Sequence, residues 1–279
     1  MMKRGGASTT EAQAAAATTS IGRCLIYLQE TESTMDLAQQ EMMNGGQSGT
    51  LILAEAQTKG RGRRGRAWAS GHGENLASTL ILHLDDFAGL FKVNFATAIA
   101  VVLACLDEDK DIQAKIKWPN DVWINGKKLC GILVDTSIQG KDTWAAVGVG
   151  VNVNQRISSL AEVEDKELQT TATSLRDVLG RNVQREVFLA RYCNHMERLM
   201  SLSLPQIIEE YQRHDMLCGN TVLVMPKGKE DPLRVEAVAL GFTETGSLRV
   251  RIVESGEEKE LYAEEVSVRP TQPQQHNAL

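Results

Sequence analysis

Short apolar runs, bounded by Gly, Pro or polar residues, recur along most of the chain and predict a β-rich fold. Asn125-Gly126 separates two of these runs and predicts a tight hairpin. A helical period of apolar residues runs over 91–106 and predicts a helix with a wide buried face. The remaining predictions are strands at 21–28, 50–56, 76–84, 114–124, 128–136 and 144–153, and helices after a Ser or Thr cap at 31–34, over 186–202 and over 205–216.

The pattern changes after residue 217, where we place a domain boundary. Four short β-rich runs follow, with Gly- and Pro-bearing turns between them, and indicate a small barrel. They lie at 221–225, 233–241, 247–253 and 259–262. We therefore predict a larger domain at 21–217 and a small β-rich domain at 218–270.

Both ends of the chain are polar and lack an apolar period. Residues 1–20 are rich in Ala, Ser and Thr and predict a disordered tail, with an organelle transit peptide as the alternative. Residues 271–279 predict a second disordered tail. The polar stretch at 155–172 predicts a surface loop within the larger domain.

The composition narrows the classes of partner. The chain has 279 residues, with 30 Lys+Arg against 36 Asp+Glu and a formal net charge of −6. A mildly acidic protein is not a general nucleic-acid binder, because phosphate binding needs a basic face. The longest apolar run, Phe95 to Leu106, is short of the about 20 residues that span a bilayer. We expect no nucleic-acid partner and no membrane partner.

The cysteines and histidines show no metal or redox pattern. The five cysteines form no CxxC pair, and the five histidines form no HxH, HxxxH or HExxH spacing. No secretory signal is visible near the N-terminus. We expect reduced thiols, no zinc site and a cytoplasmic protein, with mitochondrial import as the alternative.

One segment concentrates positive charge in this acidic chain. Residues 59–66 read KGRGRRGR and carry five positive charges. Three glycines let the backbone turn tightly and point N–H groups inward, and arginines add two-pronged donors suited to phosphate. We call residues 60–68 the arginine loop. The alternatives are a solvated charged loop, a nucleic-acid contact, and a loop for a nucleotide phosphate or an anionic substrate; the segment does not match GxxxxGK[ST].

Three further motifs carry candidate chemistry. Lys117-Trp118-Pro119-Asn120-Asp121 is either a turn or a pair of polar side chains aimed into a cleft. Lys128 enters an apolar strand, where it either extends its head group to solvent or reaches a partner. The run 148–154, GVGVNVN, is either a thinned strand packed on a helix or a place where a ligand approaches the backbone closely.

Taken in order, these motifs resemble those of the biotin protein ligase family. The resemblance covers about residues 25–268. It implies an α+β fold, with a mixed β-sheet catalytic domain layered with helices and an SH3-like barrel after it. The helix-turn-helix that some bacterial members carry does not fit residues 1–20. The matching pieces are Ser33-Thr34, Gln57, GRGRRGRAW (60–68), Asn75-Leu76, KWPNDV (117–122), KKLCGILVD (127–135), GVGVNVN (148–154) and Thr173-Ser174-Leu175-Arg176.

The resemblance implies ATP-dependent activation of biotin as biotinyl-5′-AMP and its transfer to a lysine of the biotin carboxyl-carrier domain of a carboxylase. Mg²⁺ would arrive with ATP, near Asp121, with no metal ligand assigned to the protein. Lys128, Arg61 and Arg63 would be catalytic. Biotin would contact Ser33, Thr34, Met35, Gln57, Arg61, Gly62, Arg63 and Lys128, and ATP or the adenylate would contact Arg61, Arg63, Arg64, Arg66, Trp68, Asn120, Asp121, Lys128 and Asn152.

Two departures and two rival functions accompany the resemblance. Met35 stands where many members have Asn, and Cys130 stands where Ala is common. A lipoate or octanoate ligase shares the fold and the acyl-adenylate chemistry but needs only an apolar slot, whereas Ser33-Thr34 and Gln57 offer polar groups to a ureido ring. An Arg-Gly nucleic-acid-binding protein would need further basic or aromatic stretches.

Overall fold

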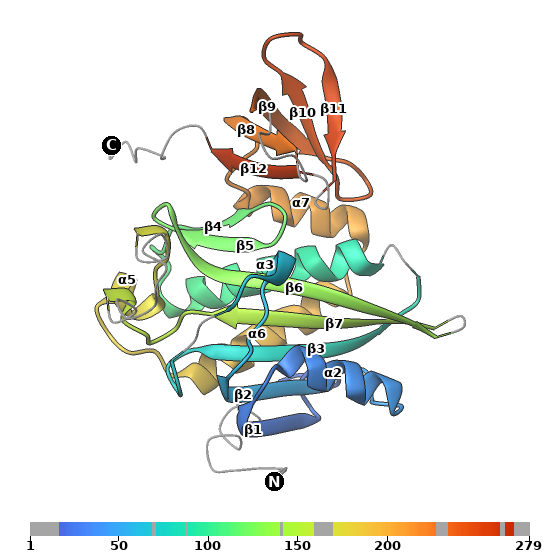
Figure 1. The fold of residues 1–279 in the computed structure, drawn as a ribbon, viewed down its shortest axis with the longest axis vertical. Helices are drawn as coiled ribbons and strands as arrows, with labels where there is room; N and C mark the ends of the chain where they lie inside the picture. Colours follow the sequence, from blue (N-terminus) through green and yellow to red (C-terminus); the bar gives the residue numbers. More distant parts are fainter. Residues whose placement is uncertain are drawn as a thin grey trace.

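The computed structural model describes residues 17–270 except 69–70, 87–88, 140–141, 159–169, 227–233 and 263–265 (Figure 1). The predicted tails therefore lie largely or wholly outside the described residues, as does most of the predicted loop at 155–172. The elements of the larger domain are β1 (Leu25–Thr31), α2 (Thr34–Met43), β2 (Leu51–Gln57), the 3₁₀ helix η1 (Arg63–Gly65), β3 (Leu76–Leu84), α3 (Gly89–Glu108), β4 (Ala114–Lys117), β5 (Asp121–Ile124), β6 (Lys127–Gln139), β7 (Asp142–Val151), α5 (Leu175–Leu179), α6 (Arg185–Met200) and α7 (Leu204–His214).

A seven-stranded mixed sheet forms the centre of the larger domain. Its strand order is β1-β2-β3-β7-β6-β5-β4, and only the β1–β2 pair is parallel among these neighbours. The hairpin predicted at Asn125-Gly126 joins β5 to β6, with Asn125 at φ 50° and Gly126 at φ 75°. The α+β class and the mixed, helix-layered sheet are confirmed.

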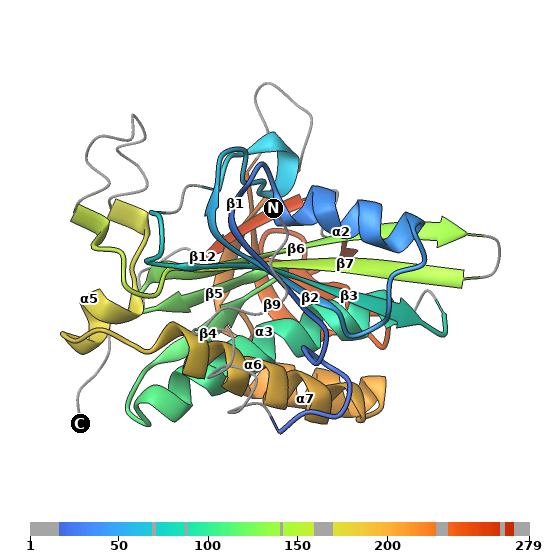
Figure 2. The ribbon, with the colours of Figure 1, turned by 90° about the horizontal axis from the view of Figure 1, so that it is seen from below.

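Helices cover the two faces of this sheet unequally (Figure 2). On one face α3, α6 and α7 pack in a large apolar cluster that includes Ile99, Phe188 and Ile207. On the other face, α2 is the one α-helix among the described residues that covers β2, β3 and β7, through a small cluster of Met35, Ala38, Met42, Ile52, Ile81 and Ala146. The rest of the second face is left for the segments that form the candidate site.

Helix α3 is the apolar centre of the larger cluster. Its 20 residues are long and apolar enough to cross a membrane by length and composition alone. In the structure it contacts α6, α7 and strands β4 to β7. Eleven of its residues, from Val93 to Cys105, are buried. Its apolar character is therefore explained by its position between the sheet and two other helices.

The single strand predicted over 114–124 is wrong, because the structure has two. β4 and β5 pair antiparallel, and Trp118-Pro119-Asn120 turns the chain between them, with a cis bond before Pro119. Proline has no N–H to offer a ladder and therefore interrupts an apolar run that otherwise favours one continuous strand. Beyond the turn, Asn120 and Asp121 contact Arg63 and Lys128, whereas the Trp118 side chain lies in the large apolar cluster.

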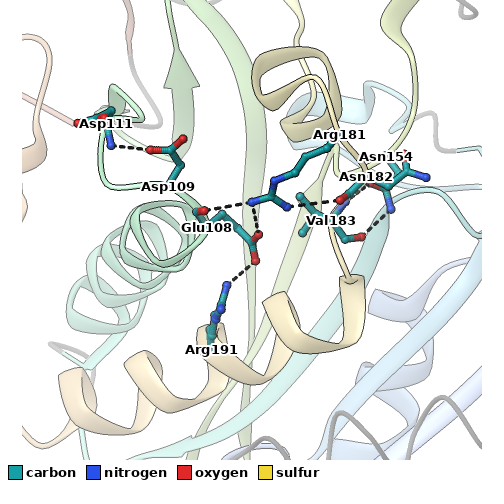
Figure 3. A network of polar contacts seen from close by, with 8 residues as sticks. All are labelled: Glu108, Asp109, Asp111, Asn154, Arg181, Asn182, Val183 and Arg191. Carbon is teal, nitrogen blue, oxygen red and sulfur yellow. Dashed lines mark hydrogen bonds and ion pairs between the residues drawn. The ribbon is translucent and has the colours of Figure 1, made fainter.

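The C-terminal end of α3 is fixed by a polar network (Figure 3). Arg181 Nη2 donates to the backbone carbonyl of Glu108 at 3.1 Å and to its carboxylate at 3.2 Å, and Arg191 pairs with the same carboxylate. Asn154 exchanges two hydrogen bonds with the backbone of Val183, at 2.9 and 2.8 Å. Asn154, the last residue of GVGVNVN, thus connects the end of β7 to the segment that leads into α6.

A small five-stranded antiparallel sheet follows α7, with the order β11-β10-β9-β8-β12. Phe95 of α3, Tyr211 of α7 and Phe242 of β9 join it to the larger domain through ring contacts of 3.9 to 5.5 Å. The strands are β8 (Thr221–Pro226), β9 (Val235–Phe242), β10 (Leu248–Ile252), β11 (Glu258–Leu261) and β12 (Val266–Pro270).

The segment before β1 differs from the predicted tail. Thr19, Ser20 and Ile21 all donate hydrogen bonds to the carboxylate of Glu197 on α6, the backbone N–H of Thr19 at 2.8 Å and that of Ile21 at 2.9 Å. The Ser- and Thr-rich composition indicates a solvated tail, but its donors meet an acceptor 176 or more residues away. Residues 17–20 are therefore part of the fold.

These hydrogen bonds predict acid sensitivity. Partial burial of Glu197 opposes ionisation, but the donors from Thr19, Ile21 and Ser20 outweigh it and lower its pKa from 4.5 to about 2. A carboxylate with a lowered native pKa stabilises the fold above its unfolded pKa, and that contribution is lost as pH falls from about 4.5 toward 2. We expect Glu197→Gln to lower the melting temperature at pH 7 and to flatten its decline between pH 5 and pH 3. Parallel melting curves for both proteins over that range would contradict this.

Candidate functional site

Three glycines leave the sheet surface bare on the face that α2 covers in part. Gly148 and Gly150 lie two residues apart on β7, and Gly131 pairs with Gly150 from β6. A methyl group built on Gly148 would lie 2.6 Å from Met35 Sδ, and one built on Gly150 would lie 2.6 Å from Trp68 Cζ2. The Gly148 end of GVGVNVN therefore fits the reading of a thinned strand packed on a helix, since Met35 belongs to α2, whereas Gly150 lies against the Trp68 side chain.

Polar groups gather at the Gly148 end of this floor. Thr34 begins α2 after the Ser33 cap, whose hydroxyl accepts from Met35 N–H at 3.3 Å. Thr34 donates its N–H and hydroxyl to Gln57 Oε1 at 2.8 and 3.0 Å. Thr79, which pairs with Gly148 in the sheet, donates to the Thr34 hydroxyl at 2.8 Å.

This polar end is almost fully enclosed. Ser33, Thr34 and Thr79 are at most 2% exposed. Buried hydroxyl and amide groups are costly unless they are hydrogen-bonded, so the network fixes their positions before any ligand binds. Met35 is also buried and lines the floor with its thioether, so the position where many relatives have Asn is apolar here.

The arginine loop folds back on itself beside this pocket. Gly62 N–H donates to the Arg66 carbonyl at 2.7 Å, Trp68 N–H donates to the Gly60 carbonyl at 2.9 Å, and Arg61 forms a bridge with Ala67. Gly60 has no room for a side chain, since a methyl group there would lie 2.5 Å from the Trp68 carbonyl. The glycines thus allow a tight turn that closes over the bare sheet surface.

Two arginines of the loop are paired with distant polar residues. Arg61 Nη2 lies 2.8 Å from Asp36 of α2 and 3.5 Å from Asp135 of β6. Arg63 Nη1 donates to Asn120 Oδ1 at 3.0 Å. Arg66 is exposed, and the side chain of Arg64 lies outside the described residues. Arg63 is half-buried, whereas Arg61 is exposed and its ion pairs lie at the surface.

Lys128 contacts a partner, which is the second of the two alternatives predicted for it. Its Nζ lies 2.7 Å from Asp121 Oδ1 and would lie 3.2 Å from a methyl group on Gly131. Next to it, burial raises the pKa of the Cys130 thiol, so this side chain stays neutral behind the ammonium group. Lys128 therefore supplies positive charge at the Gly131 and Gly150 end of the floor.

The Trp68 indole lies over Gly131 and Gly150, and the Lys128 Nζ is 5.9 Å from its ring centroid. The Trp68 Nε1 is buried without a hydrogen-bond partner among the described residues. A donor left unpaired in this way is costly, so the position favours an arriving acceptor.

Asn152, expected to contact the adenylate, is buried and hydrogen-bonded to neighbouring backbone. It is 7% exposed, and its amide donates to the Thr173 carbonyl at 3.0 Å. The backbone N–H of Asn152 donates to the Leu129 carbonyl at 3.0 Å, and the backbone N–H of Thr173 donates to the Lys128 carbonyl at 2.9 Å. Asn152 thus holds the strand that carries Lys128 rather than facing the floor.

The arrangement presents a neutral polar pocket and a cationic end on one surface. Gly148 and Gly150 are two residues apart along one strand, which is about 7 Å. This combination suits a ligand with a polar, uncharged head and an anionic tail, and in the structure Met35 and Trp68 lie against the glycines. The described residues contain no group of three or more His, Cys, Asp or Glu side chains that could hold a metal ion.

The residues missed by the sequence reasoning are Thr79, Asp36 and Asp135. Thr79 is a polar residue within the apolar run LASTLILHL, and that interruption is a usable signal. Asp36 and Asp135 carry no local signal, because their pairing with Arg61 depends on how α2, the loop and β6 meet in space.

The family model described as "Biotin/lipoate A/B protein ligase family" matches residues 26–152. The bifunctional ligase/repressor BirA of Bacillus subtilis is 36% identical over 185 residues, 66% of this chain and 55% of BirA. A biotin–[acetyl-CoA-carboxylase] ligase of Mycobacterium tuberculosis is 28% identical, over 81% of this chain and 82% of the relative. The chain thus spans about half the length of the BirA relative.

Solved structures show the same fold. The biotin protein ligase from Aquifex aeolicus, in complex with biotin and ATP, has a TM-score of 0.70 and 28% identity. The match covers 89% of this chain and 100% of that protein.

Proposed function

The chain carries a biotin/lipoate A/B protein ligase domain over residues 26–152, and from that premise we propose that the protein is an ATP-dependent biotin protein ligase. It would activate biotin as biotinyl-5′-AMP and transfer it to a lysine of a biotin carboxyl-carrier domain. The observation that carries this proposal is the glycine floor, with hydrogen-bonded Thr34, Gln57 and Thr79 at one end and Lys128 at the other.

Biotin's shape suits this floor. Its ureido ring is neutral and offers both donors and acceptors, which Ser33, Thr34 and Gln57 can match. Its carboxylate lies at the end of a flexible chain and would reach toward Lys128, Arg61 and Arg63. A biotin pocket needs this polar end, whereas the apolar slot of a lipoate or octanoate ligase does not.

In the first half-reaction, the biotin carboxylate oxygen forms a bond to the α-phosphorus of ATP, and the bond to the pyrophosphate oxygen breaks. Two anions must approach each other, so fixed positive charge is the main requirement. The Lys128 ammonium would contact both a carboxylate oxygen of biotin and a phosphate oxygen of ATP. Arg61 and Arg63 would leave their present partners, Asp36 and Asn120, for the ligand.

In the second half-reaction, the acceptor lysine amine attacks the acyl carbon of the mixed anhydride, and AMP leaves with the phosphate oxygen. Closure of the arginine loop would hold the reactive adenylate and keep water out until the carrier domain arrives. Trp68 would accompany the nucleotide part of the ligand, together with Asn120 and Asp121.

Mg²⁺ would enter with the triphosphate and shield its charge. Magnesium in such sites keeps several waters and takes one or two carboxylates from the protein, so a single carboxylate such as Asp121 suffices. We also propose that the small C-terminal sheet is the SH3-like barrel expected from the resemblance, since its antiparallel strands follow α7 directly.

Isotope exchange between pyrophosphate and ATP tests the proposal. We expect exchange that depends on biotin and is not supported by lipoate or octanoate, followed by labelling of a carrier domain when one is added. Exchange with lipoate instead of biotin would favour the rival ligase. Absence of any exchange, together with salt-sensitive retention on nucleic acid, would favour the Arg-Gly nucleic-acid binder.

A further inference from the structure

We propose that the C-terminal sheet positions the catalytic cations, through a hydrogen bond from the Trp118 indole to the turn between β9 and β10. Trp118 Nε1 donates to the Gly246 carbonyl at 3.3 Å, and Trp118 is 3% exposed. The inference rests on the proposed ligase function and assigns Trp118 and Gly246 as positioning residues, since neither lies on the glycine floor.

The turn that accepts this hydrogen bond is itself fixed. Gly246 has φ +79°, and a methyl group there would lie 3.2 Å from Phe91 and 3.3 Å from Phe95 of α3. Inside the turn, Thr243 N–H donates to the Ser247 carbonyl at 2.9 Å and Gly246 N–H to the Thr243 carbonyl at 3.0 Å. The Gly246 carbonyl is therefore held at a defined place against the larger domain.

The residues that follow Trp118 contact two of the three cations of the site, Arg63 and Lys128. Asn120 accepts from Arg63 at 3.0 Å and donates to the Ile132 carbonyl at 2.7 Å, while Ile132 N–H donates to the Asn120 carbonyl at 2.9 Å. Asp121 lies 2.7 Å from Lys128. The Trp118–Asp121 turn thus determines where Arg63 and Lys128 rest.

The Trp118–Asp121 turn is tethered from two sides. Asn94 of α3 donates to the Pro119 carbonyl at 2.9 Å, and Gly246 of the C-terminal sheet accepts from Trp118. In Figure 1 the β4–β5 hairpin lies close to α7 and to the C-terminal sheet above it. The backbone also connects the parts here, since Met216 N–H, after α7, donates to the Ile116 carbonyl at 2.9 Å.

The biotin end of the floor is independent of this tether. Its residues come from α2, β2 and β3, and the strands β2 and β3 lie toward the opposite edge of the sheet from β4 and β5. Loss of the tether should therefore reduce turnover more than it weakens biotin binding, because the contacts expected for the ureido ring remain. A general loss of structure would reduce both to the same extent.

Trp118→Phe keeps an aromatic ring and removes the indole N–H. We expect kcat for biotin-dependent pyrophosphate exchange to fall about three- to tenfold, as for loss of one hydrogen bond, with a smaller rise in the KM for biotin. Trp123→Phe is the matched control, because the Trp123 Nε1 has no hydrogen-bond partner among the described residues. Trp123→Phe should change neither kcat nor the KM for biotin.

A second measurement separates this inference from the ligase proposal. Hydrogen exchange of the Ile132 amide reports the Asn120 contact in the full chain, whether or not the protein exchanges pyrophosphate. We expect faster exchange in Trp118→Phe and wild-type exchange in Trp123→Phe.

Gly246→Ala covers the case in which Trp118→Phe is unstable, since the added methyl group displaces the turn while every residue of the larger domain keeps its identity. It should give the same fall in kcat and the same loss of Ile132 protection. Wild-type turnover and wild-type Ile132 exchange in a folded Trp118→Phe or Gly246→Ala protein would overturn the inference.

Discussion

Lys128→Arg should abolish most adenylate formation while leaving the fold intact. The Lys128 ammonium is compact and lies 2.7 Å from Asp121, in the space that Gly131 leaves open. A guanidinium is wider and planar and cannot occupy the same point between two reacting oxygens. Loss of a contact to charge that develops in the transition state costs about 2.7–4 kcal/mol, or on the order of a hundred- to a thousandfold in rate.

Lys127→Arg is the matched control for this variant. Lys127 is the preceding residue of β6 and is exposed, so we expect wild-type rates. The two half-reactions should also respond differently. Transfer from supplied biotinyl-AMP involves one anionic reactant rather than two and should suffer less. Near-normal pyrophosphate exchange in Lys128→Arg would show that a compact ammonium is not required, and that a positive charge paired with Asp121 suffices at this position.

Arg63→Ala should release the intermediate. In the structure Arg63 is held by Asn120 at 3.0 Å, on the loop that folds over the floor. If it turns to the adenylate when that is present, its loss removes one charge-assisted contact, worth about 1.5–3 kcal/mol. We expect biotinyl-AMP to dissociate about ten- to a hundredfold faster. The leaked adenylate should label lysines of a bystander protein.

Arg198→Ala is a suitable control for the loss of one positive charge. Arg198 is exposed on α6, which packs on the opposite face of the sheet. It should neither speed dissociation nor cause stray labelling. An unchanged dissociation rate in Arg63→Ala would show that the Asn120 contact is its whole role and that the other loop residues retain the intermediate.

Several parts of this protein could be predicted from the sequence. Apolar period and turn residues located the strands, the long helix and the Asn125-Gly126 hairpin, because these signals act over a few residues. The charge density of the arginine loop, the isolated Lys128 and the repeated glycines of β7 marked the site, because each is costly in an ordinary core or strand. Conformational and desolvation costs of this kind are properties of the local segment.

Other features were decided only by the tertiary structure. Sequence periodicity does not distinguish one strand from the β4–β5 pair, and it does not show that Asn152 clamps Thr173. Nor does composition reveal that Thr19 and Ser20 donate hydrogen bonds to the carboxylate of Glu197. Each of these outcomes depends on an acceptor or donor brought from far along the chain.

The same division holds within the site. The sequence by itself determined which residue types are present: cations, a neutral polar group and bare backbone. The tertiary structure decided their partners, with Asp36 and Asp135 for Arg61, Asn120 for Arg63, Asp121 for Lys128 and Gly246 for Trp118. Hydrogen bonds and ion pairs act over a few ångströms and need defined geometry, so their pairing follows from the packing of whole elements rather than from local sequence.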